Sequence, residues 1–117
     1  MSPKILKGLK KTVTNVLESD PEILNGQKIV FSDNCGKEDV KVFKEFQNRQ
    51  KNTVKVLIYP NKYSNDQIHM IISSNFYYVD YCSEKIRETI KKTFGKSTLV
   101  SFDFDVYRGM ILYTITF

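Results

Sequence analysis

The sequence predicts a single α+β domain over residues 1–117: an N-terminal amphipathic helix, then the order β-α-β-β-α-β-β, with a C-terminal β-hairpin. Three observations predict this class. Two segments carry apolar residues at helical spacing, several short segments are rich in β-branched residues, and turn-forming residues separate them. With 117 residues, 41% of them apolar, the chain can bury a core without disulfides or metals. We expect a ferredoxin-like domain or a related two-layer sandwich, with helices on one face of about four or five strands.

The first element is a helix that begins after Ser2 and ends near residue 20. Pro3 suits the first helical turn, and apolar residues then follow at helical spacing. They are Ile5, Leu6, Leu9, Val13, Val16 and Leu17. Lysines on the other face (Lys4, Lys7, Lys10 and Lys11) could lie on a membrane surface or a phosphate backbone. A solvated helix face is the preferred interpretation, because lysines there are ordinary.

Residues 28–31 predict a short buried strand that ends at the turn residues 32–34. The following stretch, 36–50, fits both helical and strand periodicity. Its Lys, Glu, Gln and Arg content favours a helix.

Two further strands are predicted in the middle of the chain. Residues 53–59 show the alternation and the β-branched residues typical of a strand, and Pro60 ends the predicted strand. Residues 67–79 form either one long strand or two pieces broken around residues 73–75. Because the first half of this segment is apolar on both sides, it should lie centrally in the sheet.

The second helix is predicted to begin at a cap, either Asp80 or Ser83, and to end at Gly95. Its apolar stripe repeats every four residues and would cover one sheet face. The rest of the segment is the most basic part of the chain, with Lys85, Arg87, Lys91, Lys92 and Lys96 against Glu84 and Glu88.

Residues 100–117 predict a hairpin around a two-residue turn, Arg108-Gly109. In that register Phe104 faces Tyr113, Phe102 faces Ile115 and Val100 faces Phe117, which makes one face apolar throughout.

The opposite face of this hairpin carries Asp103 and Asp105, roughly 7 Å apart. Such a pair could share a divalent cation, as D-x-D elements do in many glycosyltransferases and nucleotidyl transferases. The chain contains neither a Gly-rich phosphate loop nor a third acid across the hairpin. We therefore prefer the interpretation that the two carboxylates mark the solvated face.

The cysteines and the single histidine suggest no catalytic site. Cys35 and Cys82 form no C-x-x-C pair, which indicates a reducing, intracellular compartment, cytoplasmic or nuclear. A zinc site would need both cysteines, His69 and a carboxylate to converge from four separate elements. A Cys35–His69 nucleophile pair would lack an orienting group. We expect a soluble protein with no catalytic residues, no metal, no cofactor and no membrane segment.

The stretch KIVFSDNCGKEDVKVFKEFQ resembles the first strand and first helix of an RNA recognition motif. The likeness covers about 20 residues, and in that family aromatic residues of two sheet motifs stack on bases. Here Phe31 is displaced by one place from the first motif, and QIHMIISS does not match the second. No functional residue is therefore carried over from this family.

The net charge of +5 and the pI near 9.2 permit attraction to nucleic acid, to an acidic protein or to an anionic membrane, but do not choose among them. We expect a non-catalytic binding module, a small subunit of a larger assembly, that contacts RNA or another polyanion through a basic helical surface. That surface comprises Lys85, Arg87, Lys91, Lys92, Lys96, Lys7 and Lys11. The alternative is a protein–protein adaptor that uses a sheet edge or the aromatic cluster of Phe76, Tyr77, Tyr78 and Tyr81.

Overall fold

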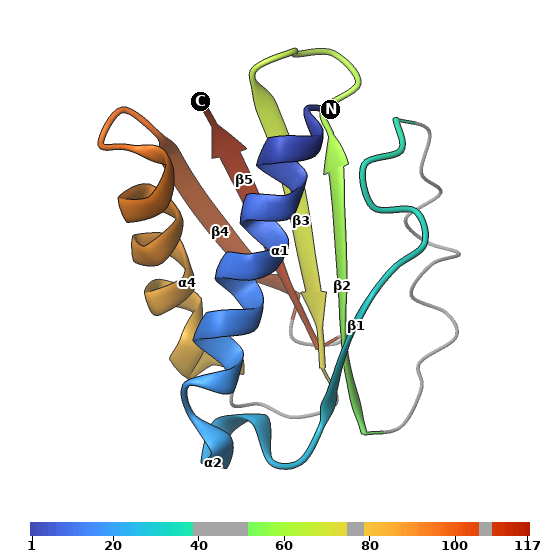
Figure 1. The fold of residues 1–117 in the computed structure, drawn as a ribbon, viewed down its shortest axis with the longest axis vertical. Coiled ribbons are helices and arrows are strands. Elements are labelled where there is room, and N and C mark those ends of the chain that lie inside the picture. The colour runs from blue at the N-terminus through green and yellow to red at the C-terminus, as the bar shows by residue number, and fades with distance from the viewer. Residues whose placement is uncertain (39–51, 75–78, 106–108) are drawn as a thin grey trace.

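The computed structural model describes residues 1–38, 52–74, 79–105 and 109–117, without the side chains of Ile23 and residues 79–81. Its helices are α1 (Pro3–Glu18), α2 (Pro21–Leu24) and α4 (Val79–Phe94), and its strands are β1 (Lys28–Phe31), β2 (Thr53–Pro60), β3 (Gln67–Ser73), β4 (Leu99–Asp105) and β5 (Met110–Thr116). The two long helices lie side by side on one face of a mixed sheet (Figure 1). The predicted α+β class is confirmed.

The five strands follow the order β1-β2-β3-β5-β4, so β3 is central, as expected. β1 and β2 are parallel, and every other neighbouring pair is antiparallel. The ferredoxin-like order is not confirmed, because a split β-α-β unit separates its parallel strands by another strand and here β1 and β2 are direct neighbours. The helix predicted between them lies largely outside the described residues.

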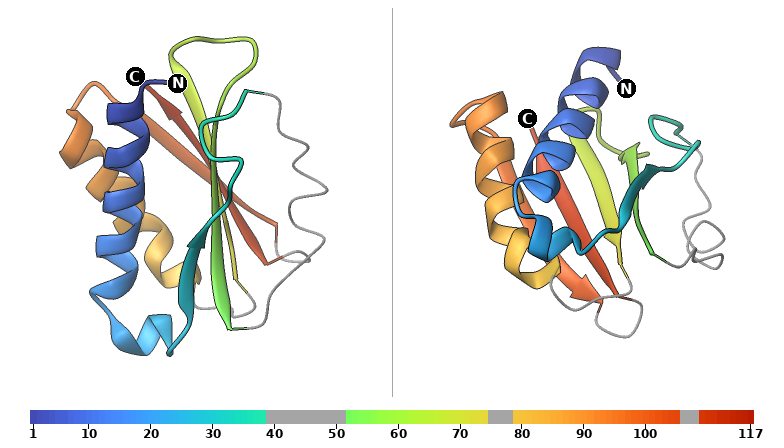
Figure 2. Two further views of the ribbon diagram at one scale, coloured as in Figure 1. Left: turned by 45° about the vertical axis from the view of Figure 1, so that its right-hand side comes forward. Right: turned by 60° about the horizontal axis from the view of Figure 1, so that its bottom comes forward.

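The main core lies between the helical layer and the sheet (Figure 2). α1 contributes fully buried residues such as Leu9 and Val13, and α4 contributes Ile86 and Ile90. The hydroxyl of Tyr113 in β5 donates a hydrogen bond to the Ser83 carbonyl, 2.9 Å away. This bond ties the sheet to α4 from within the core.

The opposite face of the sheet is less solvated than the sequence suggests. Leu57, Ile71 and Met110 are buried there in a second, smaller apolar cluster, with Cys35 and Tyr59 packed against it. Strands buried on both faces carry continuous apolar runs, and β2 and β3 each carry one.

In the β4–β5 hairpin, the side chains lie on the predicted faces of the sheet, but the cross-strand residue pairs differ from the prediction. Phe104 pairs with Ile111, and Phe102 pairs with Tyr113. The expected register was wrong by two residues, because four residues rather than two separate the strands. A shift of two preserves which side chains share a face, so Asp103 still points away from the helices.

Several element ends also differ from prediction. The four-residue helix α2 was not expected. α4 begins at Val79, so Asp80 and Ser83 lie inside the helix and do not cap it. Gly95 ends this helix as predicted, at a φ of 113° that favours glycine.

Candidate polyanion-binding site

The candidate site depends on how α1 packs on α4. Near one end of the pair, Gly8 of α1 faces Phe94 of α4 so closely that a Cβ on Gly8 would lie 2.9 Å from the ring. Near the other end, the Lys85 ammonium donates a hydrogen bond to Ser19 Oγ at 3.1 Å. The helices are therefore antiparallel, and the beginning of α1 lies beside the end of α4 (Figure 1).

This antiparallel packing brings residues 4–11 of α1, which contain several lysines, beside the lysines in the last turn of α4 and just after it. We call them the lysine patch: Lys4, Lys7, Lys11, Lys91, Lys92 and Lys96. All six are exposed except Lys91, which is half-buried. Glu18 and Glu84 lie at the opposite end of the layer. Positive charge is therefore concentrated where α1 begins and α4 ends.

Two residues of the predicted basic surface lie away from the patch and have protein partners. Lys85 is near the beginning of α4, bonded to Ser19. Arg87 forms an ion pair with Glu84, and its Nε donates to Glu84 Oε1 at 2.9 Å. That hydrogen bond lowers the pKa of the Glu84 carboxyl. The structure thus divides the predicted surface into two parts.

Lys10 also has a local role, which explains its separation from the other lysines of α1. Its Nζ lies 5.5 Å from the centroid of the Phe31 ring, in cation–π geometry. The Lys10 ammonium therefore faces Phe31 of β1 and does not extend the lysine patch.

A pocket of about 540 Å³ adjoins the patch at the same end of the molecule. It is bordered by the beginning of α1, by the β2–β3 loop and by the end of β5. Residues that line it include Ser2, Ile5 and Phe117, together with one basic residue, Lys62, and two acidic residues, Glu38 and Asp66. Phe117 in turn packs edge-on against Phe94 of α4, with 5.4 Å between ring centroids. The loop, the beginning of α1 and the end of α4 are thus neighbours.

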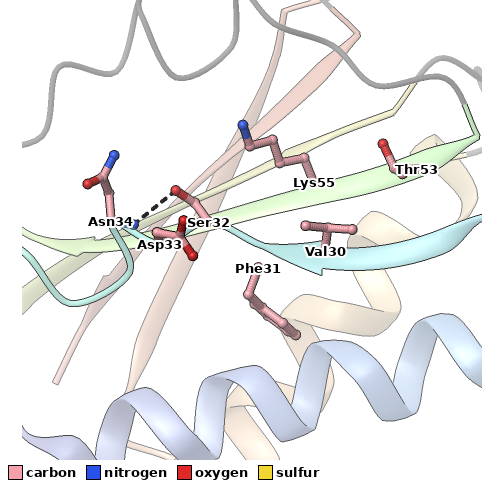
Figure 3. A pocket seen from close by; sticks show the side chains of 7 residues that line it. All are labelled: Val30, Phe31, Ser32, Asp33, Asn34, Thr53 and Lys55. Atoms are coloured by element: carbon pink, nitrogen blue, oxygen red, sulfur yellow. Dashed lines mark hydrogen bonds between the residues drawn. The ribbon is translucent and has the colours of Figure 1, made fainter.

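A second pocket, of about 450 Å³, lies where β1 ends (Figure 3). Its lining residues are Val30, Phe31, Ser32, Asp33, Asn34, Thr53 and Lys55. Ser32 Oγ accepts a hydrogen bond from the Asn34 N–H at 3.1 Å, while the Phe31 ring points toward α1. Asp33 and Lys55 give this pocket opposite charges, so it suits a small polar molecule better than a polyanion.

The structure also places the residues once considered for catalysis or metal binding. His69 pairs with Tyr59 across β2 and β3, with ring centroids 5.3 Å apart, and burial lowers the pKa of the imidazole. Cys82 is buried on the helix side of the sheet, where burial raises the pKa of its thiol, so the sheet separates it from His69. The thiol of Cys35 points at the Val56 carbonyl, 3.6 Å away. The four-element zinc site is therefore not assembled.

Asp103 is exposed and Asp105 is half-buried, on the sheet face away from the helices. Within residues 1–38, 52–74, 79–105 and 109–117, no three His, Cys, Asp or Glu side chains form a group that could hold a metal ion. The carboxylate pair is therefore without a third acidic or histidine ligand in this part of the chain.

Three members of the aromatic cluster, Phe76, Tyr77 and Tyr78, lie outside the described residues. The fourth, Tyr81, belongs to the first turn of α4. The prediction that they contact a protein partner stays a prediction.

Comparisons with protein-family models, with curated proteins and with solved structures find no match for this chain. In the described part of the chain, no helix is both long and apolar enough to cross a membrane.

Proposed function

We propose that this chain is a non-catalytic, intracellular binding module, a small subunit of a larger assembly, that binds RNA or another polyanion through the lysine patch. One observation carries the proposal. The antiparallel packing of α1 on α4 places the lysines of α1 and those of the end of α4, about 80 residues apart in the sequence, on neighbouring helices.

The chemistry of the patch favours contacts with phosphates over reading of bases. Its cations are all lysines, which act as mobile point charges and lack the planar fork with which arginine reads guanine. Binding of this kind releases counterions, so it weakens steeply with salt. If all six lysines contacted phosphates of a single strand, log K would fall with log salt at a slope of about −4.

The test is a matched pair of triple variants. Lys7→Gln, Lys11→Gln and Lys92→Gln remove three charges from the patch. The control, Lys28→Gln, Lys55→Gln and Lys85→Gln, removes three charges from outside the patch. Both change the net charge equally, so only the location of the charges differs.

Binding to RNA and to inorganic polyphosphate is measured from about 50 mM to about 200 mM salt. The patch variant should lose at least tenfold in affinity, and its salt slope should be shallower by about 2, while the control keeps the wild-type slope. Equal loss in both variants would refute the patch as the site. An absence of binding by the wild type at low salt would refute the function.

An outer strand of the described sheet supports a second function, that of a protein adaptor. β4 is the outermost strand next to β5. Its Leu99 and Phe104 are 65% and 44% exposed, on opposite faces of the strand. The fitting partner is an extended segment of another protein that adds a strand to β4 and covers these side chains.

Lysines on an edge strand oppose strand addition, so Leu99→Lys with Phe104→Lys tests the adaptor function. A stoichiometric protein partner should survive nuclease treatment, bind the lysine-patch variant normally and be lost from the edge variant. A partner that nuclease releases would instead indicate bridging by nucleic acid.

A further inference from the structure

Tyr63, in the loop between β2 and β3, is the most exposed large hydrophobic residue that the structure describes, at 90%. The rest of this loop, NKYSND, is polar. A tyrosine with so little contact adds almost nothing to the stability of the fold, because its ring stays in water in the folded state.

Hydrogen bonds nevertheless hold the loop that presents this ring. The Tyr63 N–H donates to Asn61 Oδ1 at 2.8 Å, and the Asn61 N–H donates to the Gln67 carbonyl at 2.9 Å. The Phe117 N–H donates to the Asp66 carbonyl, also at 2.9 Å, which ties the loop to the end of β5. The backbone is thus already ordered, so a ligand that stacks on the ring need not order it.

The loop lies at the end of the molecule that carries the lysine patch. Asn61, Lys62 and Ser64 line the same pocket as Ser2 and Ile5 at the beginning of α1. Phe117, 37% exposed, connects this pocket to the end of α4 through Phe94. An exposed tyrosine therefore lies at the end of the fold where α1 begins and α4 ends, near lysines of the patch and near two acidic residues, Glu38 and Asp66.

We propose that the ligand of the lysine patch is a single-stranded nucleic acid and that Tyr63 stacks on one of its bases. This inference rests on the proposed polyanion binding and adds the class of ligand. Lysines neutralise phosphates regardless of strandedness, but an aromatic ring can stack only on a base whose face is open. In a duplex both faces of each internal base are already stacked.

The experiment measures binding of a single-stranded RNA of roughly 12 nucleotides, of its blunt duplex and of inorganic polyphosphate, by fluorescence anisotropy or competition. Tyr63→Ala should weaken binding of the single strand about tenfold or more. Tyr63→Phe keeps the ring and should stay within about twofold of wild type. Neither variant should change binding of the duplex or of polyphosphate, or alter the salt slope, because no charge is lost.

Phe104→Ala is the matched control, because it removes an exposed aromatic ring from β4, away from the patch. Unchanged affinity of Tyr63→Ala for the single strand, together with the expected loss in the lysine-patch variant, would overturn the stacking role and leave polyanion binding intact. Equal weakening of single strand, duplex and polyphosphate by Tyr63→Ala would also overturn it. If wild type binds none of the three probes, polyanion binding itself fails.

Discussion

Replacing Gly8 with alanine tests the contact that brings the lysine patch together. In a helix interior, alanine is normally more stable than glycine by about 1 kcal/mol. Here the new Cβ would lie 2.9 Å from Phe94 Cζ and 3.3 Å from Cε1. Carbon atoms attract one another at roughly 3.5–4.0 Å, so the ring would have to move.

Movement of this ring has a cost, because Phe94 already packs edge-on against Phe117 at an interplanar angle of 80°. Overpacking of this kind costs about 1–3 kcal/mol, which offsets or exceeds the gain in helix propensity. We therefore expect Gly8→Ala to lower the free energy of unfolding by up to about 2 kcal/mol in urea denaturation.

Phe94→Leu provides the background that isolates this effect, since leucine is too short to reach the new Cβ. In that background Gly8→Ala should stabilise the protein by about 1 kcal/mol. The double-mutant cycle then gives a coupling of about 1–3 kcal/mol between the two positions. Equal stabilisation by Gly8→Ala in both backgrounds would refute the close packing of α1 on α4.

Three further experiments test a buried hydrogen bond, the packing of the core and the pH dependence of stability. Tyr113→Phe should cost about 1 kcal/mol in urea denaturation, because it removes the hydrogen bond to the buried Ser83 carbonyl; full wild-type stability would contradict that bond. Ile90→Ala should cost about 2–5 kcal/mol and the exposed Thr93→Ala no more than about 0.5, and similar losses would contradict the burial of Ile90. Burial lowers the folded-state pKa of His69 below 6.5, so the unfolded state binds the proton more tightly and stability should fall as pH drops through 6.5. Urea denaturation of wild type and His69→Gln at about pH 7.5 and about pH 5 checks this, and an equal loss in both would refute it.

Periodicity was sufficient to predict the two long helices and most of the strands, because side-chain burial repeats with the geometry of each element. It could not set the hairpin register. A shift of two residues leaves every side chain on its own face, so the pattern in residues 99–117 is satisfied equally by both registers. The length of the turn decides between them, and Arg108-Gly109 only suggested a short one.

The lysines themselves were visible in the sequence, but their grouping was not. It depends on α1 packing antiparallel on α4, a contact between segments about 80 residues apart that has no local signal. The same contact moves Lys85 and Arg87 out of the patch. For Tyr63 a signal was present, namely a single aromatic residue among the polar residues of NKYSND.

The lysines of the two helices are not equally strong evidence for a ligand. Lys91 and Lys92 lie in the last turn of α4, where the helix dipole stabilises cations by about 0.3–1 kcal/mol, so helix stability alone accounts for them. Lys4 lies in the first turn of α1, which contains no acidic residue, and there the same dipole disfavours a cation. Glu18, at the other end of α1, is opposed by the dipole as well. Since helix stability would favour the reverse placement of Lys4 and Glu18, Lys4 is a stronger argument for a ligand than Lys91 or Lys92, and the packing of α1 on α4 brings the two helix ends together.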